Sequence, residues 1–416
     1  MTGRLRQAVR VVPAAVLAAV AAASVLSTRR PTSAPKGPGA DARVPAPVGI
    51  APAALRGVAP SPDAGVTAAP RMLHGDPRHT HRGPRGPRAA ELLWRAELGA
   101  PVEAQVVASP DEKVLYVAAL DGRLSALDAA TGAVRWIVDL GDRAYATPLV
   151  ADDGSIFAGS DAKKLFRVAP DGTVRWRLEL GGEVDTAPAP LPDGSIVVAA
   201  GRELHCVRPR GDVAWRFAAK GKIFSSPAVS HDGTVLFGSQ DDRLYAVGSD
   251  GRLRFSIDLG ADVDASPAIG DDGAVYVGTD VGELVRIDDG KITWRVPLGG
   301  YVRGALSIAR NGDVLAGVYG PSPRQVRVSP DGRVVGALSV QGTGARDFGV
   351  HGGAAEDASG ALYFGAQDDF VYAVGPAGEL LFRFQAGADV DAPITLLSDG
   401  SAVFADDRGT VYHLRP

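Results

Sequence analysis

The chain has 416 residues and a formal net charge of −4, with 52 glycines, 30 prolines and a single cysteine. One cysteine excludes an intrachain disulfide and a metal site built from cysteines alone. The glycine and proline content favours many short strands and tight turns, and the length allows a large core.

The first 28 residues have the layout of a secretory signal peptide. Three arginines precede an uncharged, Ala- and Val-rich stretch at 11–28, and Ala21-Ala22-Ala23 offers a cleavage site. At 18 residues the stretch also meets the lower limit of a membrane span, so an uncleaved anchor is the alternative. We therefore expect an exported protein, periplasmic or extracellular, that either loses residues 1–28 or is held at the inner membrane by them.

Two further segments precede the repeats. Residues 29–70 are rich in proline and alanine and lack helical periodicity, which predicts a disordered tether. Residues 71–90 form a lead-in segment that contains three histidines and an aspartate, at His74, Asp76, His79 and His81. These are metal-ligand types, but in a lead-in segment we expect no bound metal.

Charge is distributed unevenly along the chain. Residues 1–90 carry 13 basic and 3 acidic side chains, whereas residues 91–416 carry 31 and 45. An acidic body argues against nucleic-acid binding, because no basic face is available for phosphates.

From residue 91 onward the sequence repeats itself about every 40 residues. Equivalent positions, which we call the marker positions, are held by Trp94, Trp136, Trp176, Trp215, Phe255, Trp294, Gly336 and Phe382. Repeats of this length, built from strands and Asp-Gly turns, are typical of β-propeller blades. The aromatic marker side chains are expected to pack between neighbouring blades.

Each repeat is predicted to be a four-stranded antiparallel meander. In one repeat the expected strands are 263–269, 274–278, 284–287 and 293–298. Asp-Gly pairs suit the turns between them, because glycine accepts a positive φ and aspartate hydrogen-bonds the local backbone. Cys206 falls in an apolar strand and is expected to be a small buried side chain.

The repeat count predicts eight blades. The marker positions delimit seven complete repeats, and the residues after Phe382 supply only three further strands. The missing strand is present at 92–98, and pairing it with the last strand removes two exposed sheet edges. The sequence therefore predicts an all-β, eight-bladed β-propeller at 91–416, closed by an N-terminal strand.

The repeat also resembles a known family. Ala126-Leu127-Asp128-Ala129-Ala130-Thr131-Gly132-Ala133-Val134-Arg135-Trp136 is similar to the tryptophan-docking repeat of pyrroloquinoline quinone (PQQ) dehydrogenases and their non-enzymatic relatives. Eight blades and a modest length most resemble the PQQ-like propeller subunit of the bacterial outer-membrane β-barrel assembly machinery, which implies binding of partner proteins. The chain departs from that family in its long tether and in lacking a lipidated cysteine. The dehydrogenases hold calcium and usually two adjacent cysteines beside the quinone, which one cysteine cannot supply.

Chain geometry predicts a polar opening at one end of the ring. In a meander, the loops leading into the inner strands and the loops joining second and third strands share one face. Residues three positions before a recurrent proline site would line that opening: Glu103, Tyr145, Asp185, Phe224, Asp264, Arg303, His351 and Asp391. Irregular loops at 319–324 and 341–348, the latter with Arg346, belong to the same face. Such a mouth is either a solvated channel or a site for a polar ligand or partner side chain.

The sequence thus leads to one functional expectation and one alternative. We expect an exported, monomeric, non-enzymatic scaffold that binds envelope proteins, without cofactor, metal or nucleic acid. Its expected contact residues are Glu103, Asp185, Asp264, Arg303, Arg346, His351 and Asp391. The alternative is a small-ligand or quinone-binding propeller related to PQQ-dependent dehydrogenases.

Overall fold

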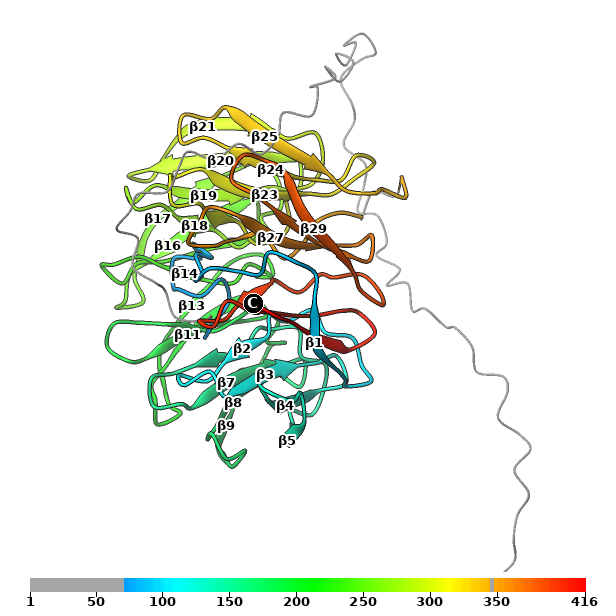
Figure 1. Cartoon of the computed structure of the whole chain (residues 1–416). Helices are drawn as coiled ribbons and strands as arrows, with labels where there is room; N and C mark the ends of the chain where they lie inside the picture. Colours follow the sequence, from blue (N-terminus) through cyan, green and yellow to red (C-terminus); the bar gives the residue numbers. More distant parts are fainter. Residues whose placement is uncertain (1–70, 345–347) are drawn as a thin grey trace, which may run out of the picture. The chain divides into compact units, whose positions relative to one another are not determined.

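The computed structural model describes residues 71–344 and 348–416, so the expectations for residues 1–70 and for Arg346 lie outside it. The described residues contain 32 strands and belong to one compact unit. Eight four-stranded antiparallel sheets form the blades of a ring (Figure 1). The predicted eight-bladed all-β propeller is therefore confirmed. Within the described ranges no helix is long and apolar enough to cross a membrane.

Blades 1 to 4 follow one another along the chain, each from its inner to its outer strand. Blade 1 comprises β2 (Val107–Ala108), β3 (Val114–Ala118), β4 (Arg123–Asp128) and β5 (Val134–Asp139). Blade 2 comprises β6 (Leu149–Val150), β7 (Ile156–Ser160), β8 (Lys164–Val168) and β9 (Val174–Glu179). Blade 3 comprises β10 (Ala189–Pro190), β11 (Ile196–Ala200), β12 (Glu203–Val207) and β13 (Val213–Ala218). Blade 4 comprises β14 (Ala228–Val229), β15 (Val235–Ser239), β16 (Arg243–Val247) and β17 (Leu253–Asp258).

Blades 5 to 8 repeat this arrangement, and only the last takes a strand from elsewhere. Blade 5 comprises β18 (Ala268–Ile269), β19 (Val275–Gly278), β20 (Glu283–Asp288) and β21 (Lys291–Pro297). Blade 6 comprises β22 (Ser307–Ile308), β23 (Val314–Val318), β24 (Arg324–Val328) and β25 (Val334–Ser339). Blade 7 comprises β26 (Ala355–Glu356), β27 (Leu362–Ala366), β28 (Phe370–Val374) and β29 (Leu380–Gln385). Blade 8 comprises β30 (Thr395–Leu396), β31 (Ala402–Ala405), β32 (Thr410–Leu414) and, as its outer strand, β1 (Leu92–Glu97).

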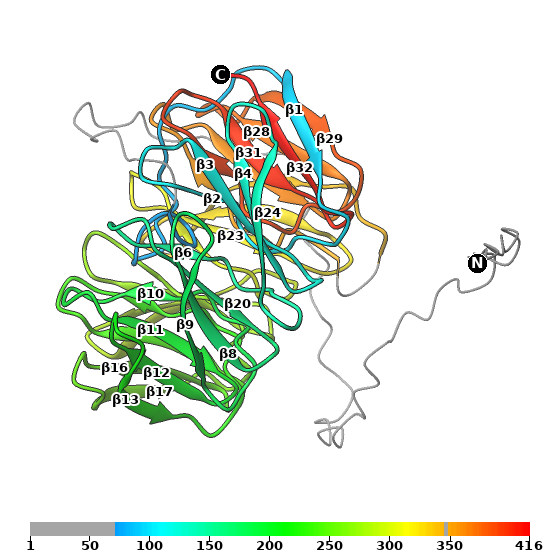
Figure 2. The ribbon, with the colours of Figure 1, turned by 90° about the horizontal axis from the view of Figure 1, so that it is seen from below.

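The strand β1 closes the ring as predicted. It pairs antiparallel with β32, with Trp94 opposite His413 (Figure 2). The two rings meet edge to face, with centroids 5.1 Å apart, and the Trp94 indole N–H donates to Ala129 O of blade 1 at 2.9 Å. The closing strand thus completes blade 8 and also joins it to blade 1.

The inner strands are shorter than the sequence predicts. Blade 5 was expected to begin with a strand at 263–269, but β18 is only Ala268–Ile269. The preceding residues cross from blade 4, and the Val263 N–H donates to Ser239 O there at 3.3 Å. Pro267 has no N–H to give to a sheet ladder, so pairing begins only after it.

The aromatic marker residues pack between blades, as expected. The Trp136 indole N–H donates to Pro170 O of blade 2 at 2.9 Å. Its ring covers Gly172, where an added Cβ would lie only 2.9 Å from the indole and φ is +85°. Trp94, Trp176, Trp215 and Trp294 make the same indole-to-carbonyl hydrogen bond to the next blade.

The lead-in segment packs against one end of the central channel. Its backbone carbonyls accept N–H groups from inner strands of blades 2, 4, 5, 6 and 7, for example Ile269 N–H to Arg78 O at 2.9 Å. Met72 is 4% exposed, and the three histidines are no more than 2% exposed. We call residues 71–82 the plug, and the face that it closes the plugged face.

Candidate functional site

The mouth positions that the structure describes lie where the chain enters the inner strands, at the end of the channel opposite the plug, and Arg346 lies outside the described residues. Three of them are hydrogen-bonded to the loop that joins the second and third strands of the preceding blade. Gln240 donates to Asp264 at 3.3 Å, Arg303 donates to Asp280 at 2.8 Å, and Gln367 donates to Asp391 at 3.0 Å. The two kinds of loop therefore share one face, as the meander geometry requires.

The remaining mouth positions contact their neighbours around the ring. Lys222 lies 3.8 Å from the Asp185 carboxylate, and its Nζ lies 4.5 Å from the centre of the Phe224 ring. His351 packs edge to face on Tyr319, with centroids 5.8 Å apart. Glu103 interacts electrostatically with both His351 and Asp391. These interactions link blades 7, 8 and 1.

The mouth carries carboxylates that retain protons unusually well. Burial raises the pKa of Asp185 to about 7, with a contribution from Asp161, and that of Asp264 to about 6, with a contribution from Asp280. Asp161 and Asp280 lie in the loops between second and third strands and were not among the predicted site residues. Their signal was available, because an aspartate recurs at that point in several repeats.

One arc of the mouth is more acidic than the rest. It consists of Glu103, Asp389, Asp391 and Asp407, from blades 1 and 8, and we call it the acidic arc. Burial and the neighbouring Asp391 raise the pKa of Asp389 to about 6 and that of Asp407 to about 8. Asp391 is 8% exposed, and its Oδ1 has no hydrogen-bond partner among the described residues. A cation or an N–H donor placed there would therefore be stabilised.

The plug histidines are engaged with the backbone. His74 stacks on His81 with ring centroids 4.2 Å apart, and its two ring nitrogens lie 3.0 Å from Leu306 O and 2.8 Å from Gly352 O. His79 Nδ1 lies 2.9 Å from Pro267 O. Burial lowers the pKa of His74 and of His79 to about 4, so both are neutral near pH 7.

The described residues do not fit a calcium–quinone centre. Across residues 71–344 and 348–416, no group of three or more His, Cys, Asp or Glu side chains could hold a metal ion. The plug histidines direct ring nitrogens at carbonyl oxygens, and burial raises the pKa of Cys206, within blade 3, to about 11.

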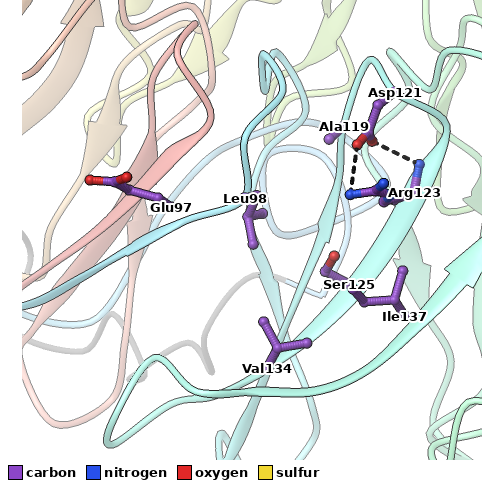
Figure 3. A pocket seen from close by; sticks show the side chains of 8 residues that line it. All are labelled: Glu97, Leu98, Ala119, Asp121, Arg123, Ser125, Val134 and Ile137. Carbon is purple, nitrogen blue, oxygen red and sulfur yellow. Dashed lines mark hydrogen bonds and ion pairs between the residues drawn. The ribbon is translucent and has the colours of Figure 1, made fainter. Parts of the chain in front are cut away.

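A small pocket lies at the junction of blades 8 and 1. Figure 3 shows the side chains that line it: Glu97, Leu98, Ala119, Asp121, Arg123, Ser125, Val134 and Ile137. Arg123 forms an ion pair with Asp121 at 3.2 Å. The volume is about 90 Å³. Since a water molecule takes roughly 30 Å³, the pocket suits a few waters more than a ligand.

Comparison with known proteins identifies the repeat. The sequence model of the family described as outer membrane protein assembly factor BamB matches residues 86–168, 162–258 and 240–335. The chain belongs to the BamB family. The three matches together cover more than half of it. No curated protein matches the chain.

Solved structures agree with this fold. BamB from Moraxella catarrhalis superposes with a TM-score of 0.65 and 16% identity, over 79% of this chain and 100% of that one. Quinohemoprotein alcohol dehydrogenase from Comamonas testosteroni gives 0.70 and 13%, over 85% and 81%. A europium-containing methanol dehydrogenase gives 0.70 and 11%, over 82% and 90%. Because the identities are this low, the structural likeness shows the fold alone, and it includes enzymes as well as BamB.

Proposed function

We propose that this BamB-family propeller is an exported, non-enzymatic scaffold that binds protein partners of the cell envelope at its mouth. The observation that carries the proposal is the acidic arc, where Asp391 and Asp407 each keep an unpartnered carboxylate oxygen among the described residues. Such atoms are costly to bury unless a partner satisfies them. The family match supports a protein partner over a small substrate.

The mouth also offers a varied set of contacts around this arc. Arg303 lies over the Tyr301 ring at 4.4 Å and is already paired with Asp280, so it can contribute both charge and an apolar surface. His351 lies on the same rim. We therefore expect Glu103, Asp185, Asp264, Arg303, Arg346, His351 and Asp391 to contact the partner, with opposite charges of the partner facing the acidic arc.

Matched neutralisation of the two faces tests this proposal. Asp389→Asn with Asp391→Asn should weaken capture of partners from envelope extract by the full chain about tenfold, because about 1.4 kcal/mol per factor of ten is within reach of two charge pairs. The control is Asp153→Asn with Asp193→Asn, since both residues lie in first hairpin turns on the plugged face, where Asp153 pairs with Arg167 and Asp193 accepts from Ser195 N–H. Charge reversal of Arg303 and Arg346 to Glu should also weaken capture. Loss of the partner in the control, with capture retained by the mouth variants, would overturn the assignment.

The alternative, a quinone-binding propeller, rests on its dehydrogenase neighbours. Incubation of the full chain with calcium and PQQ separates the two classes. A stoichiometric shift in quinone absorbance would favour the alternative, and an unchanged spectrum would favour the scaffold.

A further inference from the structure

A second pocket lies on the plugged face, between blades 4 and 5. Its volume is about 500 Å³, within the range of roughly 300–1,000 Å³ that is usual for ligand sites. Leu236, Phe255, Ile269, Val275 and Ile287 supply its apolar walls. Its rim includes the first hairpin turns of the two blades, at residues 230–234 and 270–273, so it lies away from the mouth.

The pocket lies beside the marker position of blade 4, where phenylalanine replaces the usual tryptophan. In blade 2, Arg167 lies opposite Trp176, and both side chains donate to Pro209 O of the next blade. In blade 5, Arg286 and Trp294 bind Pro330 O in the same way. The corresponding pair in blade 4 is Ala246 and Phe255. An alanine also faces the marker in blade 1, where Ala126 lies opposite Trp136, so the difference in blade 4 is the phenylalanine. Its ring covers Gly290, 3.2 Å from an added Cβ, but it is smaller than the indole that occupies this wedge after five other blades.

The turn facing the wedge enlarges it further. Asp288 pairs directly with Lys291, which leaves the two-residue turn Asp289-Gly290. Blade 2 has the longer turn Pro170-Asp171-Gly172, whose proline packs near Gly154. In blade 5 the corresponding Gly273 has no atom within 4 Å of its added Cβ.

Blade 7 has the other Ala–Phe pair, and there a segment of the chain itself covers the corresponding position. In blade 7, Ala373 lies opposite Phe382, and Tyr363 stands where blade 4 has Leu236. The chain's own lead-in covers this position, because the Tyr363 hydroxyl donates to Pro87 O at 2.9 Å and Gly86 lies against the ring. Between blades 4 and 5 the same position opens into the pocket.

Charge narrows the choice of occupant. The pocket is lined by four carboxylates, Asp232, Asp271, Asp272 and Asp289, and by one guanidinium, Arg78. Asp271 is paired with Arg78 at 2.9 Å and with Arg82 at 2.8 Å, and Asp272 is paired with Arg286 at 2.8 Å. Asp232 and Asp289 therefore supply the negative charge available to a ligand. Asp289 is exposed at the rim of the pocket. It lies on the turn next to which an indole would enter. A cation beside an aromatic ring is therefore the complementary group.

We propose that this pocket binds a tryptophan side chain of a partner protein, next to a lysine or arginine in the partner's sequence. The indole packs against Phe255 and the other apolar walls, beside the wedge that the chain's own tryptophans fill in five other places, and the basic side chain faces Asp289 and Asp232. The interaction is independent of the mouth and adds a second contact surface to the propeller.

Short peptides test the proposal on the full-length protein by calorimetric titration. Acetyl-Lys-Trp-Lys-amide should bind, and acetyl-Lys-Ala-Lys-amide and acetyl-Glu-Trp-Glu-amide should each bind at least tenfold more weakly. Phe255→Trp fills the wedge from within, as other blades do, and should reduce binding at least tenfold. Leu253→Trp is the matched control, because it adds an indole at an exposed site on the same strand that does not line the pocket, and binding should be unchanged.

A second variant keeps the test valid if Phe255→Trp does not fold. Asp289→Lys changes only an exposed turn residue and should reverse the preference between the lysine and glutamate peptides. Equal binding of all three peptides, or unchanged binding by both Phe255→Trp and Asp289→Lys, would overturn the proposal.

Discussion

His74, His79 and His81 place three imidazoles in the closed end of a channel with almost no solvent contact. Their ring nitrogens lie against carbonyl oxygens of blades 5, 6, 7 and 8, so each ring is fixed by strands distant in sequence. Burial holds their pKa values below the usual range, whereas burial at the mouth holds carboxylate pKa values above it. The two ends of the channel therefore respond to pH in opposite ways.

The plug should loosen in acid. The pKa of His79 is about 4 in the folded state and near 6.5 when unfolded, so its contribution to stability is complete above pH 6.5 and is lost as pH falls towards 4. The loss amounts to about 3 kcal/mol for one histidine, at about 1.4 kcal/mol per pKa unit. His79→Asn keeps a donor for Pro267 O but cannot titrate, so its melting temperature should fall less between pH 6.5 and 4. An identical pH dependence in the two proteins would contradict this role.

The mouth carboxylates act with the opposite sign. Asp407 has its pKa raised to about 8, so its favourable contribution is complete in acid and is lost as pH rises through 8. The melting temperatures of the unaltered protein and of Asp407→Asn should be compared at the same pH. This comparison separates the contribution of Asp407 from that of the plug histidines, which both proteins share.

At the scale of elements, the seam between β1 and β32 joins the two ends of the propeller. Arg415 N–H also donates to Glu91 O at 2.8 Å, which extends the pairing beyond the strand. A seam of this kind has no covalent closure, so its strength is that of one strand pair and of the side chains across it, such as Trp94 and His413.

Successive N-terminal truncations should resolve the contributions of plug and seam. Removal of residues 1–70 provides the reference protein, because it retains both the plug and the seam. Removal of 1–90 should lower the melting temperature by exposing the channel end, and removal of 1–98 should lower it further by leaving β32 as an open edge. Thermal unfolding gives the melting temperature of each of the three truncated proteins. A melting temperature unaffected by loss of 91–98 would show that β1 is dispensable.

The elements also show how far the sequence could be read. Marker spacing was sufficient for the blade count, for β1 as closing strand and for the shared mouth face, because these follow from a repeat with fixed chain direction. The short inner strands were missed, since residues such as Val263 pair with the preceding blade and look like strand in sequence. The plug was missed because its contacts with five blades are non-local. The pocket between blades 4 and 5 had a sequence signal, namely Phe255 at a position that tryptophan holds in five other blades.

For the whole molecule, the contrast between a basic N-terminal region and an acidic propeller matters most. The first 90 residues carry 13 basic and 3 acidic side chains, and the remainder 31 and 45. A basic start followed by an apolar stretch favours export, and an acidic body disfavours non-specific binding to nucleic acid.

Export is directly testable. Residues 1–28 should direct the protein out of the cytoplasm, so cell fractionation should find the propeller in the envelope or outside the cell. Replacement of Arg4, Arg6 and Arg10 by Glu should retain it in the cytoplasm. A cytoplasmic pool of the unaltered protein with Met1 intact would contradict export, and an exported protein that keeps residues 1–28 would identify them as an anchor.

The pairing of β1 with β32 also determines when the ring can close during synthesis. The residues of β1 leave the ribosome more than 300 residues before those of β32, to which they pair. At roughly 5–20 residues per second this interval is about 15–60 s. Throughout it, β1 lacks its partner strand, and the ring can close only after synthesis has reached blade 8. Until then blade 1 and the most recently made blade each have one flank uncovered, so completion of blade 8 determines when both flanks are protected from aggregation and proteolysis.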